Sequence, residues 1–128
     1  MLDHISITVA DVETAKTFYE KALKPIGVSV VMSVSAPETG TTGFYGFGEG
    51  QKPYFWIGEG PKHSGPIHIA LTADARAKVD AFYTAALAAG ATDNGPPGIR
   101  AHYHPNYYGA FVIDLDGHNL EAVCHAPG

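Results

Sequence analysis

The first quarter of the chain changes from the alternation typical of a strand to the spacing typical of a helix. Within residues 2–9, apolar and polar side chains alternate, which predicts a strand with one buried face. Apolar residues then recur at helical spacing over residues 12–23, which predicts an amphipathic helix. Asp11 stands directly before this helix, where an aspartate can cap the first turn, and Pro25 and Gly27 end it.

The remaining elements follow the same order in both halves of the chain. Three strand-like stretches separated by glycine and proline come after the first helix, over residues 28–34, 42–47 and 54–57. In the second half, the same patterns predict a strand over 67–72, a helix over about 74–89, and strands near 99–102, 108–113 and 119–124. The glycine-rich residues 58–65 are typical of a linker, and Gly-Pro-Pro-Gly over 95–98 is typical of a loop.

The two halves also repeat in sequence. His4 opens the first predicted strand and His68 opens its equivalent, 64 residues later. At this offset, seven residues between positions 4 and 23 are identical to their counterparts, where chance gives about one or two. A repeat of this length indicates two copies of one supersecondary unit.

We therefore expect an α+β fold in a single domain, residues 1–128, made of two tandem βαβββ modules. The first module covers about 1–58 and the second about 66–128. The helices should cover the outer face of the sheets, and the opposite face should form a curved cleft.

Composition excludes several partners. A net charge of −5 leaves too few cations to neutralise nucleic-acid phosphates. No apolar run approaches the ~20 residues that span a bilayer. Cys124 is the single cysteine, so no disulfide can form within the chain, and no apolar signal segment opens the sequence. We expect a cytoplasmic protein with no nucleic-acid or membrane partner.

Three residues form a candidate metal site. His4 and His68 point to the face away from the helices, and Glu121 is a charged residue in the otherwise apolar last strand. Two imidazoles and one carboxylate fixed on strands are typical of sites that hold a divalent transition metal with open positions. A metal-free arrangement, in which Glu121 accepts hydrogen bonds from neutral histidines, would also satisfy a buried carboxylate.

The repeat suggests that one ligand is missing. Subtracting the 64-residue offset from Glu121 gives Ile57, which can neither bind a metal nor accept a proton. The symmetric position to Glu121 is therefore expected to be apolar.

These features resemble the vicinal-oxygen-chelate superfamily, which includes glyoxalase I, bleomycin-resistance proteins, fosfomycin-resistance transferases and extradiol dioxygenases. The resemblance rests on the paired modules, the histidine opening each, and the segment Asp114–Glu121, Asp-Leu-Asp-Gly-His-Asn-Leu-Glu. Leu115 replaces the proline usual in this turn. Residues from His104 to Glu121 are most like those of small bacterial members with two modules.

The resemblance implies a metal-dependent enzyme, a lyase or a dioxygenase, acting on a small oxygen-containing substrate chelated to one divalent ion. Fe, Mn, Ni and Zn all remain open as the metal. It implies His4, His68 and Glu121 as ligands, in a homodimer where His4 of one chain can join His68 and Glu121 of the other. Ile57 departs from the glyoxalase I pattern, so efficient glyoxalase I activity is not expected. The alternative is a metal-free protein that binds a small ligand, like the bleomycin-resistance proteins.

Further candidates surround these ligands. Glu121 and His104 are the candidate catalytic groups, His104 as a base in place of the missing carboxylate; an ordinary surface loop is the other interpretation of His104. Phe55 and Ile57 are expected to form an apolar wall for the substrate, with core packing as the competing interpretation, and Tyr108 is expected to face the cleft. Trp56, on the other face of its strand, is expected to pack against a helix.

Overall fold

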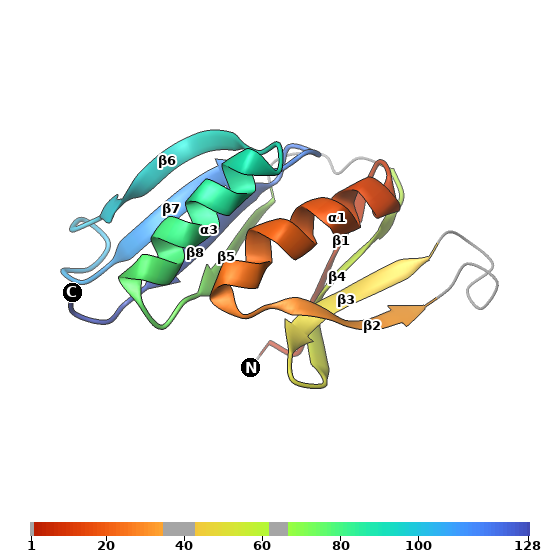
Figure 1. Ribbon diagram of the computed structural model, residues 1–128, viewed down its shortest axis with the longest axis horizontal. Helices are drawn as coiled ribbons and strands as arrows, with labels where there is room; N and C mark the ends of the chain where they lie inside the picture. Colours follow the sequence, from red (N-terminus) through yellow and green to blue (C-terminus); the bar gives the residue numbers. More distant parts are fainter. Residues whose placement is uncertain (1, 35–42, 62–66) are drawn as a thin grey trace.

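The structure, a computed structural model, describes residues 2–34, 43–61 and 67–128 (Figure 1). The first half contains β1 (Ile5–Val9), α1 (Val12–Leu23), a short 3-10 helix η1 (Lys24–Ile26), β2 (Ser29–Val34), β3 (Phe44–Glu49) and β4 (Lys52–Glu59). The second half contains β5 (His68–Thr72), α3 (Arg76–Ala88), β6 (Thr92–Ile99), β7 (Tyr108–Ile113) and β8 (Asn119–Cys124). The predicted α+β fold of two tandem βαβββ modules is confirmed.

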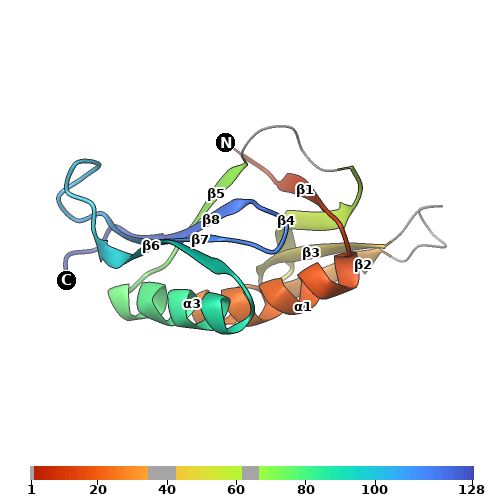
Figure 2. The ribbon, with the colours of Figure 1, turned by 90° about the horizontal axis from the view of Figure 1, so that it is seen from above.

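Each module forms its own four-stranded sheet. The strand orders are β1-β4-β3-β2 and β5-β8-β7-β6, with the first pair in each order parallel and the others antiparallel. Both helices lie on the same side of the two sheets, as Figure 2 shows. The opposite face of each sheet therefore has no helix over it, and this is the face on which the candidate ligands were expected.

Local sequence explains the first helix. The Asp11 side chain accepts hydrogen bonds from the backbone N–H groups of Glu13 and Thr14, both at 3.1 Å, as its position predicted. The apolar stripe of α1 is buried, and Gly27 ends the following turn at a φ of 84°. No helix in the described residues is long and apolar enough to cross a membrane.

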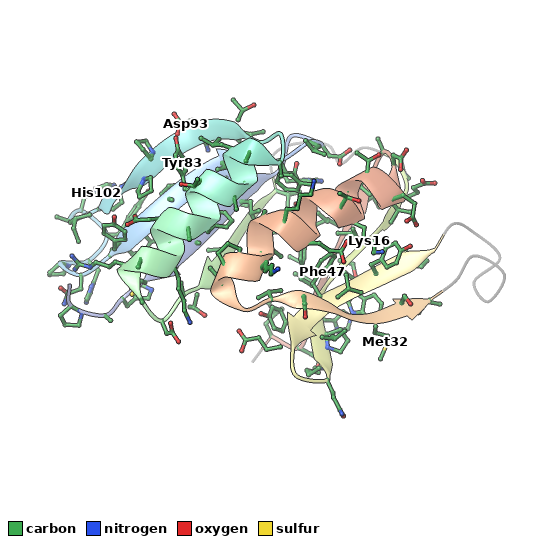
Figure 3. The ribbon with its side chains drawn as sticks, in the orientation of Figure 1. Lys16, Met32, Phe47, Tyr83, Asp93 and His102 are labelled. Atoms are coloured by element: carbon green, nitrogen blue, oxygen red, sulfur yellow. The ribbon has the colours of Figure 1, made fainter. Side chains whose placement is uncertain are left out.

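The core lies between the helices and the sheets. In the first module, Tyr19 of α1 packs edge-on against Phe55 of β4, with ring centroids 5.0 Å apart, and both rings approach Phe47 of β3. Figure 3 shows Phe47 beneath α1. In the second module, Phe82, the counterpart of Phe18 at the 64-residue offset, is also fully buried, whereas Tyr83, the counterpart of Tyr19, is only partly buried.

The strand predicted near residues 99–102 is wrong. The strand is β6, which includes the predicted loop 95–98, and the following residues 100–106 form turns instead. β6 is the edge strand of its sheet, and its register shifts twice around Gly95. An edge strand tolerates prolines because one row of its N–H groups needs no partner.

The turn over residues 114–118 of the second module makes several hydrogen bonds to the first module. The buried Asp114 carboxylate accepts a hydrogen bond from the hydroxyl of Tyr19 in α1. In the same turn, Asp116 accepts from the backbone N–H of Ala10 at 2.8 Å. The ring of His118 donates to the carbonyl oxygen of Thr8 at 3.1 Å. No strand described in one sheet pairs with a strand of the other, so these contacts and the helix packing join the modules.

We expect Tyr19→Phe to destabilise the protein. The substitution leaves one oxygen of the buried Asp114 without this donor, which costs about 1–3 kcal/mol of unfolding free energy. Tyr45→Phe is the matched control, because Tyr45 also donates to a carboxylate, that of Glu13, but at an exposed site, where we expect less than about 0.5 kcal/mol. Urea unfolding measures both, and equal losses would contradict the role of the buried bond.

Candidate functional site

The face of the second sheet that carries no helix brings His68 and Glu121 together. β5 and β8 are parallel neighbours, with His68 opposite Asn119 and Ala70 opposite Glu121. The two side chains therefore share one face, and His68 Nε2 lies 2.8 Å from Glu121 Oε1. Glu121 is 0% exposed, whereas the His68 side chain is 51% exposed. A buried carboxylate thus meets an imidazole that solvent and small molecules can reach.

Tyr107 contacts the other oxygen of the same carboxylate. Its hydroxyl donates a hydrogen bond to Glu121 Oε2. Burial, this hydrogen bond and the charge of Glu121, in that order of size, raise the pKa of Tyr107 well above the ordinary value for tyrosine. Tyr107 therefore stays a neutral donor through the physiological pH range.

The prediction that Tyr108 faces the cleft is wrong, and the residue that contacts Glu121 is its neighbour Tyr107, which no sequence pattern singled out. The hydroxyl of Tyr108 donates to Asp80 of α3 at 2.6 Å, and the guanidinium of Arg76 lies over its ring. Tyr108 therefore faces the helix, not the cleft. Tyr107 directly precedes β7, and consecutive residues along an extended chain face opposite sides, so the two adjacent tyrosines lie on opposite faces of the sheet.

Phe111 and Arg100 continue this face of the sheet. The ring centroid of Phe111 lies 6.1 Å from that of His68, and the Arg100 guanidinium stacks over Phe111 at 5.4 Å. Arg100 also donates to the carbonyl oxygens of Pro96 and Gly98 at 2.7 and 2.9 Å. The His68–Glu121 pair is thus bordered by an aromatic ring and by a cation that the backbone holds in place.

His4 lies apart from this pair. Its Nδ1 is 2.7 Å from the Asp3 carboxylate, and it lines a hollow of about 560 Å³ on the first sheet. His68 lines a different hollow, of about 700 Å³, between β5 and the ends of β1 and β4. Among the residues that the structure describes, no three His, Cys, Asp or Glu side chains lie close enough together to hold a metal ion. One chain therefore brings together two of the three predicted ligands.

His104 lies in the loop before β7. It is exposed, its Nδ1 accepts a hydrogen bond from the backbone N–H of Asn106 at 3.1 Å, and its ring lies 6.0 Å from that of His125. This contact belongs to the loop itself, which fits the surface-loop interpretation of His104.

The expected faces of β4 are reversed. Phe55 and Ile57 are fully buried in the core, which fits the competing interpretation, core packing, although Phe55 also borders the hollow that His68 lines. Trp56 was expected to pack against a helix, but it lines the hollow beside His4 on the other face.

The same register corrects the symmetric counterpart of Glu121. Ser6 pairs with Trp56 in the first sheet as Ala70 pairs with Glu121 in the second. The counterpart of Glu121 is thus Trp56 and not Ile57, because the second module has one more residue between its helix and its third strand. The conclusion that no second carboxylate occupies this position stands.

Known proteins resemble the chain in sequence profile and in fold. The profile of the glyoxalase/bleomycin resistance protein/dioxygenase superfamily matches residues 1–122. A glyoxalase/bleomycin resistance protein from Albidiferax ferrireducens T118 is similar in structure, with 26% identity, a TM-score of 0.76 and coverage of 99% of each chain. No curated protein sequence matches the chain closely enough to count as a relative.

Two further solved structures share the fold. The fosfomycin resistance protein FosX from Listeria monocytogenes, complexed with manganese(II) and 1S,2S-dihydroxypropylphosphonic acid, has 19% identity and a TM-score of 0.69, over 96% of this chain and 88% of its own. Glyoxalase I from Zea mays has 19% identity and a TM-score of 0.72, over 96% of this chain and 45% of its own.

The raised pKa of Tyr107 predicts a loss of stability in alkali. Above about pH 10 the tyrosine ionises in the unfolded chain but stays neutral in the folded one. The contribution of Tyr107 to the free energy of unfolding is therefore complete below about pH 10. It falls as the pH rises towards the higher pKa of Tyr107 in the folded state. Urea unfolding between about pH 8 and pH 11 should show a smaller decline for Tyr107→Phe than for the wild type. Equal declines would contradict this assignment.

Proposed function

Since the chain belongs to the glyoxalase/bleomycin resistance protein/dioxygenase superfamily, we propose that it is a homodimeric, metal-dependent enzyme acting on a small oxygen-containing substrate. The observation that carries this proposal is the His68–Glu121 pair. A carboxylate with no exposed surface meets a half-exposed imidazole at 2.8 Å, so two groups that bind divalent transition metals point at one another.

These donors fit a divalent metal. A neutral imidazole and a carboxylate are ordinary ligands of Fe, Mn, Ni and Zn, and a second imidazole would complete a two-histidine, one-carboxylate set. Binding would displace the proton that now lies between Nε2 and Oε1. The Mn(II) named in the FosX complex supports a metal at such a site.

We assign the third ligand to His4 of a second copy of this chain. His4 has the position in the first module that His68 has in the second, yet the two line separate hollows in one chain. The first sheet also exposes apolar side chains on this face, with Met32 45% exposed and Trp56 half-buried beside it. A partner chain that covers this face would bury them and bring His4 to the pair.

The chain's own groups define the chemistry. A bound metal would act as a Lewis acid that polarises a substrate oxygen. His68 and Glu121 would hold it, with the Glu121 carboxylate fully buried and the His68 imidazole half-exposed. Arg100 and Phe111 border the pair and can contact an anionic or aromatic part of the substrate. His104 remains the candidate base, and whether the reaction is that of a lyase or a dioxygenase depends on the substrate.

A second candidate function is metal-free binding of a small ligand, as in bleomycin-resistance proteins. One observation favours it: both oxygens of Glu121 already have partners within the chain, His68 and Tyr107. The burial of this carboxylate is therefore satisfied without an ion. Metal analysis of the purified protein separates the two functions.

We expect the wild type to bind a divalent metal, and His4→Ala, His68→Ala and Glu121→Gln each to lose most of the affinity. His102→Ala is the control, because His102 is exposed in the loop and contacts Tyr103 instead of the pair. Calorimetric titration of metal-free protein measures the affinities. Full metal content in both His68→Ala and Glu121→Gln would contradict the site.

Mixed dimers test whether the site lies between chains. A dimer of one His4→Ala chain and one Glu121→Gln chain, purified through two different tags, keeps one complete ligand set only if the set spans both chains. We expect such dimers to bind half as much metal as the wild type, and each parent variant almost none. No metal in the mixed dimer would show that one chain supplies all three ligands.

We expect no efficient glyoxalase I activity. Isomerising a hemithioacetal moves a proton between adjacent carbons and needs a base beside the metal. The position symmetric to Glu121 is Trp56, which cannot accept a proton. The assay uses methylglyoxal and glutathione with metal-reconstituted protein. Turnover near ~10 per second, an ordinary enzyme value, would contradict this expectation and make His104→Ala the next variant to assay.

A further inference from the structure

We propose that Tyr107 is a positioning residue that restricts Glu121 to a single metal-binding oxygen, Oε1. The inference rests on the proposed function, since it assigns Tyr107 a role toward the ion that His68 and Glu121 would hold. Tyr107 itself touches neither substrate nor metal in this role.

The two oxygens of Glu121 have different surroundings. Oε1 faces His68 Nε2, which is half-exposed, and Oε2 accepts the hydrogen bond of the Tyr107 hydroxyl. A carboxylate can bind a metal through one oxygen or through both. With Oε2 occupied by a neutral donor, only Oε1 is directed toward the imidazole.

The ring of Tyr107 is held on several sides. The rings of Tyr103 and His125 pack against it, with centroids 5.0 and 5.2 Å away. Its backbone is also bonded, since its carbonyl accepts from the N–H of Arg100 at 2.7 Å and its N–H donates to the carbonyl of His104 at 3.0 Å. The hydroxyl is therefore placed by packing and by the loop, not by Glu121 alone.

Gly109 makes the contact sterically possible. A Cβ at this position would lie 3.1 Å from the Tyr107 ring and 3.3 Å from Glu121 Oε2. Both distances are tighter than ordinary contacts. The glycine thus leaves room for the hydroxyl to reach the carboxylate from the neighbouring strand.

Binding through one oxygen has a chemical consequence. Two imidazoles and a one-oxygen carboxylate occupy three positions on a metal, which leaves more positions open than a two-oxygen carboxylate would. Two neighbouring oxygens of one substrate need two open positions. Tyr107 would therefore preserve the coordination sites on which substrate binding depends.

The test is metal binding by Tyr107→Phe in the 128-residue chain, with cobalt(II) as the probe. Residues that orient metal ligands typically contribute 10–100-fold to affinity, so we expect the dissociation constant for cobalt(II) to rise by about 10-fold or more. We also expect the visible spectrum of bound cobalt(II) to change, because Oε2 becomes free to bind. The spectrum reports on coordination and needs no enzymatic activity.

Tyr108→Phe is the matched control. It removes a tyrosine–carboxylate hydrogen bond one residue away, on the helix side of the sheet, and should leave the affinity and the spectrum unchanged. Gly109→Ala is the second variant; it keeps the hydroxyl but crowds it, should weaken binding in the same direction, and decides the question if Tyr107→Phe does not fold.

Three results would overturn the inference, in two different ways. Wild-type affinity and spectrum in Tyr107→Phe, or an equal loss in Tyr108→Phe, would overturn the role of Tyr107 and leave the proposed function intact. Failure of the wild type itself to bind cobalt(II), manganese(II), nickel(II), zinc(II) or iron(II) would overturn the proposed function and the inference with it.

Discussion

The arrangement of the two modules depends on the turn from Asp114 to His118 together with the packing of α1 and η1 against α3. The two sheets do not share a strand pair in the described residues, so nothing in the backbone ladders fixes one module against the other. Asp114, Asp116 and His118 supply that link through Tyr19, Ala10 and Thr8. The Asp114 bond is buried, where losing a donor costs most. Both helices lie on one side of the sheets, and no helix covers the opposite faces.

Those two free faces share a backbone pattern but carry different side chains. In the first sheet the Trp56 ring lies over Gly46 and the Phe44 ring over Gly58, where any added Cβ would clash with the ring. In the second sheet the register places Phe111 beside Glu121 and Gly109 beside Val123. Along the equivalent strands β3 and β7, the aromatic residue and the glycine have therefore exchanged places, because Phe44 corresponds to Gly109 and Gly46 to Phe111. The first face carries apolar rings around His4 and the second a buried carboxylate, so the two faces of the duplicated fold differ in their chemistry.

Sequence patterns predicted the fold well because strand alternation and helical spacing depend on neighbouring residues. They also identified His68 and Glu121, because a repeated histidine and a charge in an apolar strand are visible without coordinates. These patterns gave wrong assignments where a single residue changes which side chains of a strand face which side of the sheet. Because the second module has one additional residue, the counterpart of Glu121 is Trp56 and not Ile57. Gly-Pro-Pro-Gly was interpreted as a loop, although it lies within the irregular strand β6. Tyr107 and Tyr108 are chemically identical, so only the register separates them.

The motif that carries the family resemblance has two separate tasks. Its first part, Asp114 to His118, is structural, since its side chains bond to the first module instead of facing the cleft. Its last residue, Glu121, follows His118 by three positions. Glu121 faces the side of the sheet that carries no helix, and it is the candidate chemical group of the motif. A chain can therefore retain most of this motif for stability whatever reaction it performs. Outside this motif, Tyr107 and Phe111 contact Glu121 and His68, and Arg100 lies over Phe111, so the surroundings of the pair come from other parts of the chain.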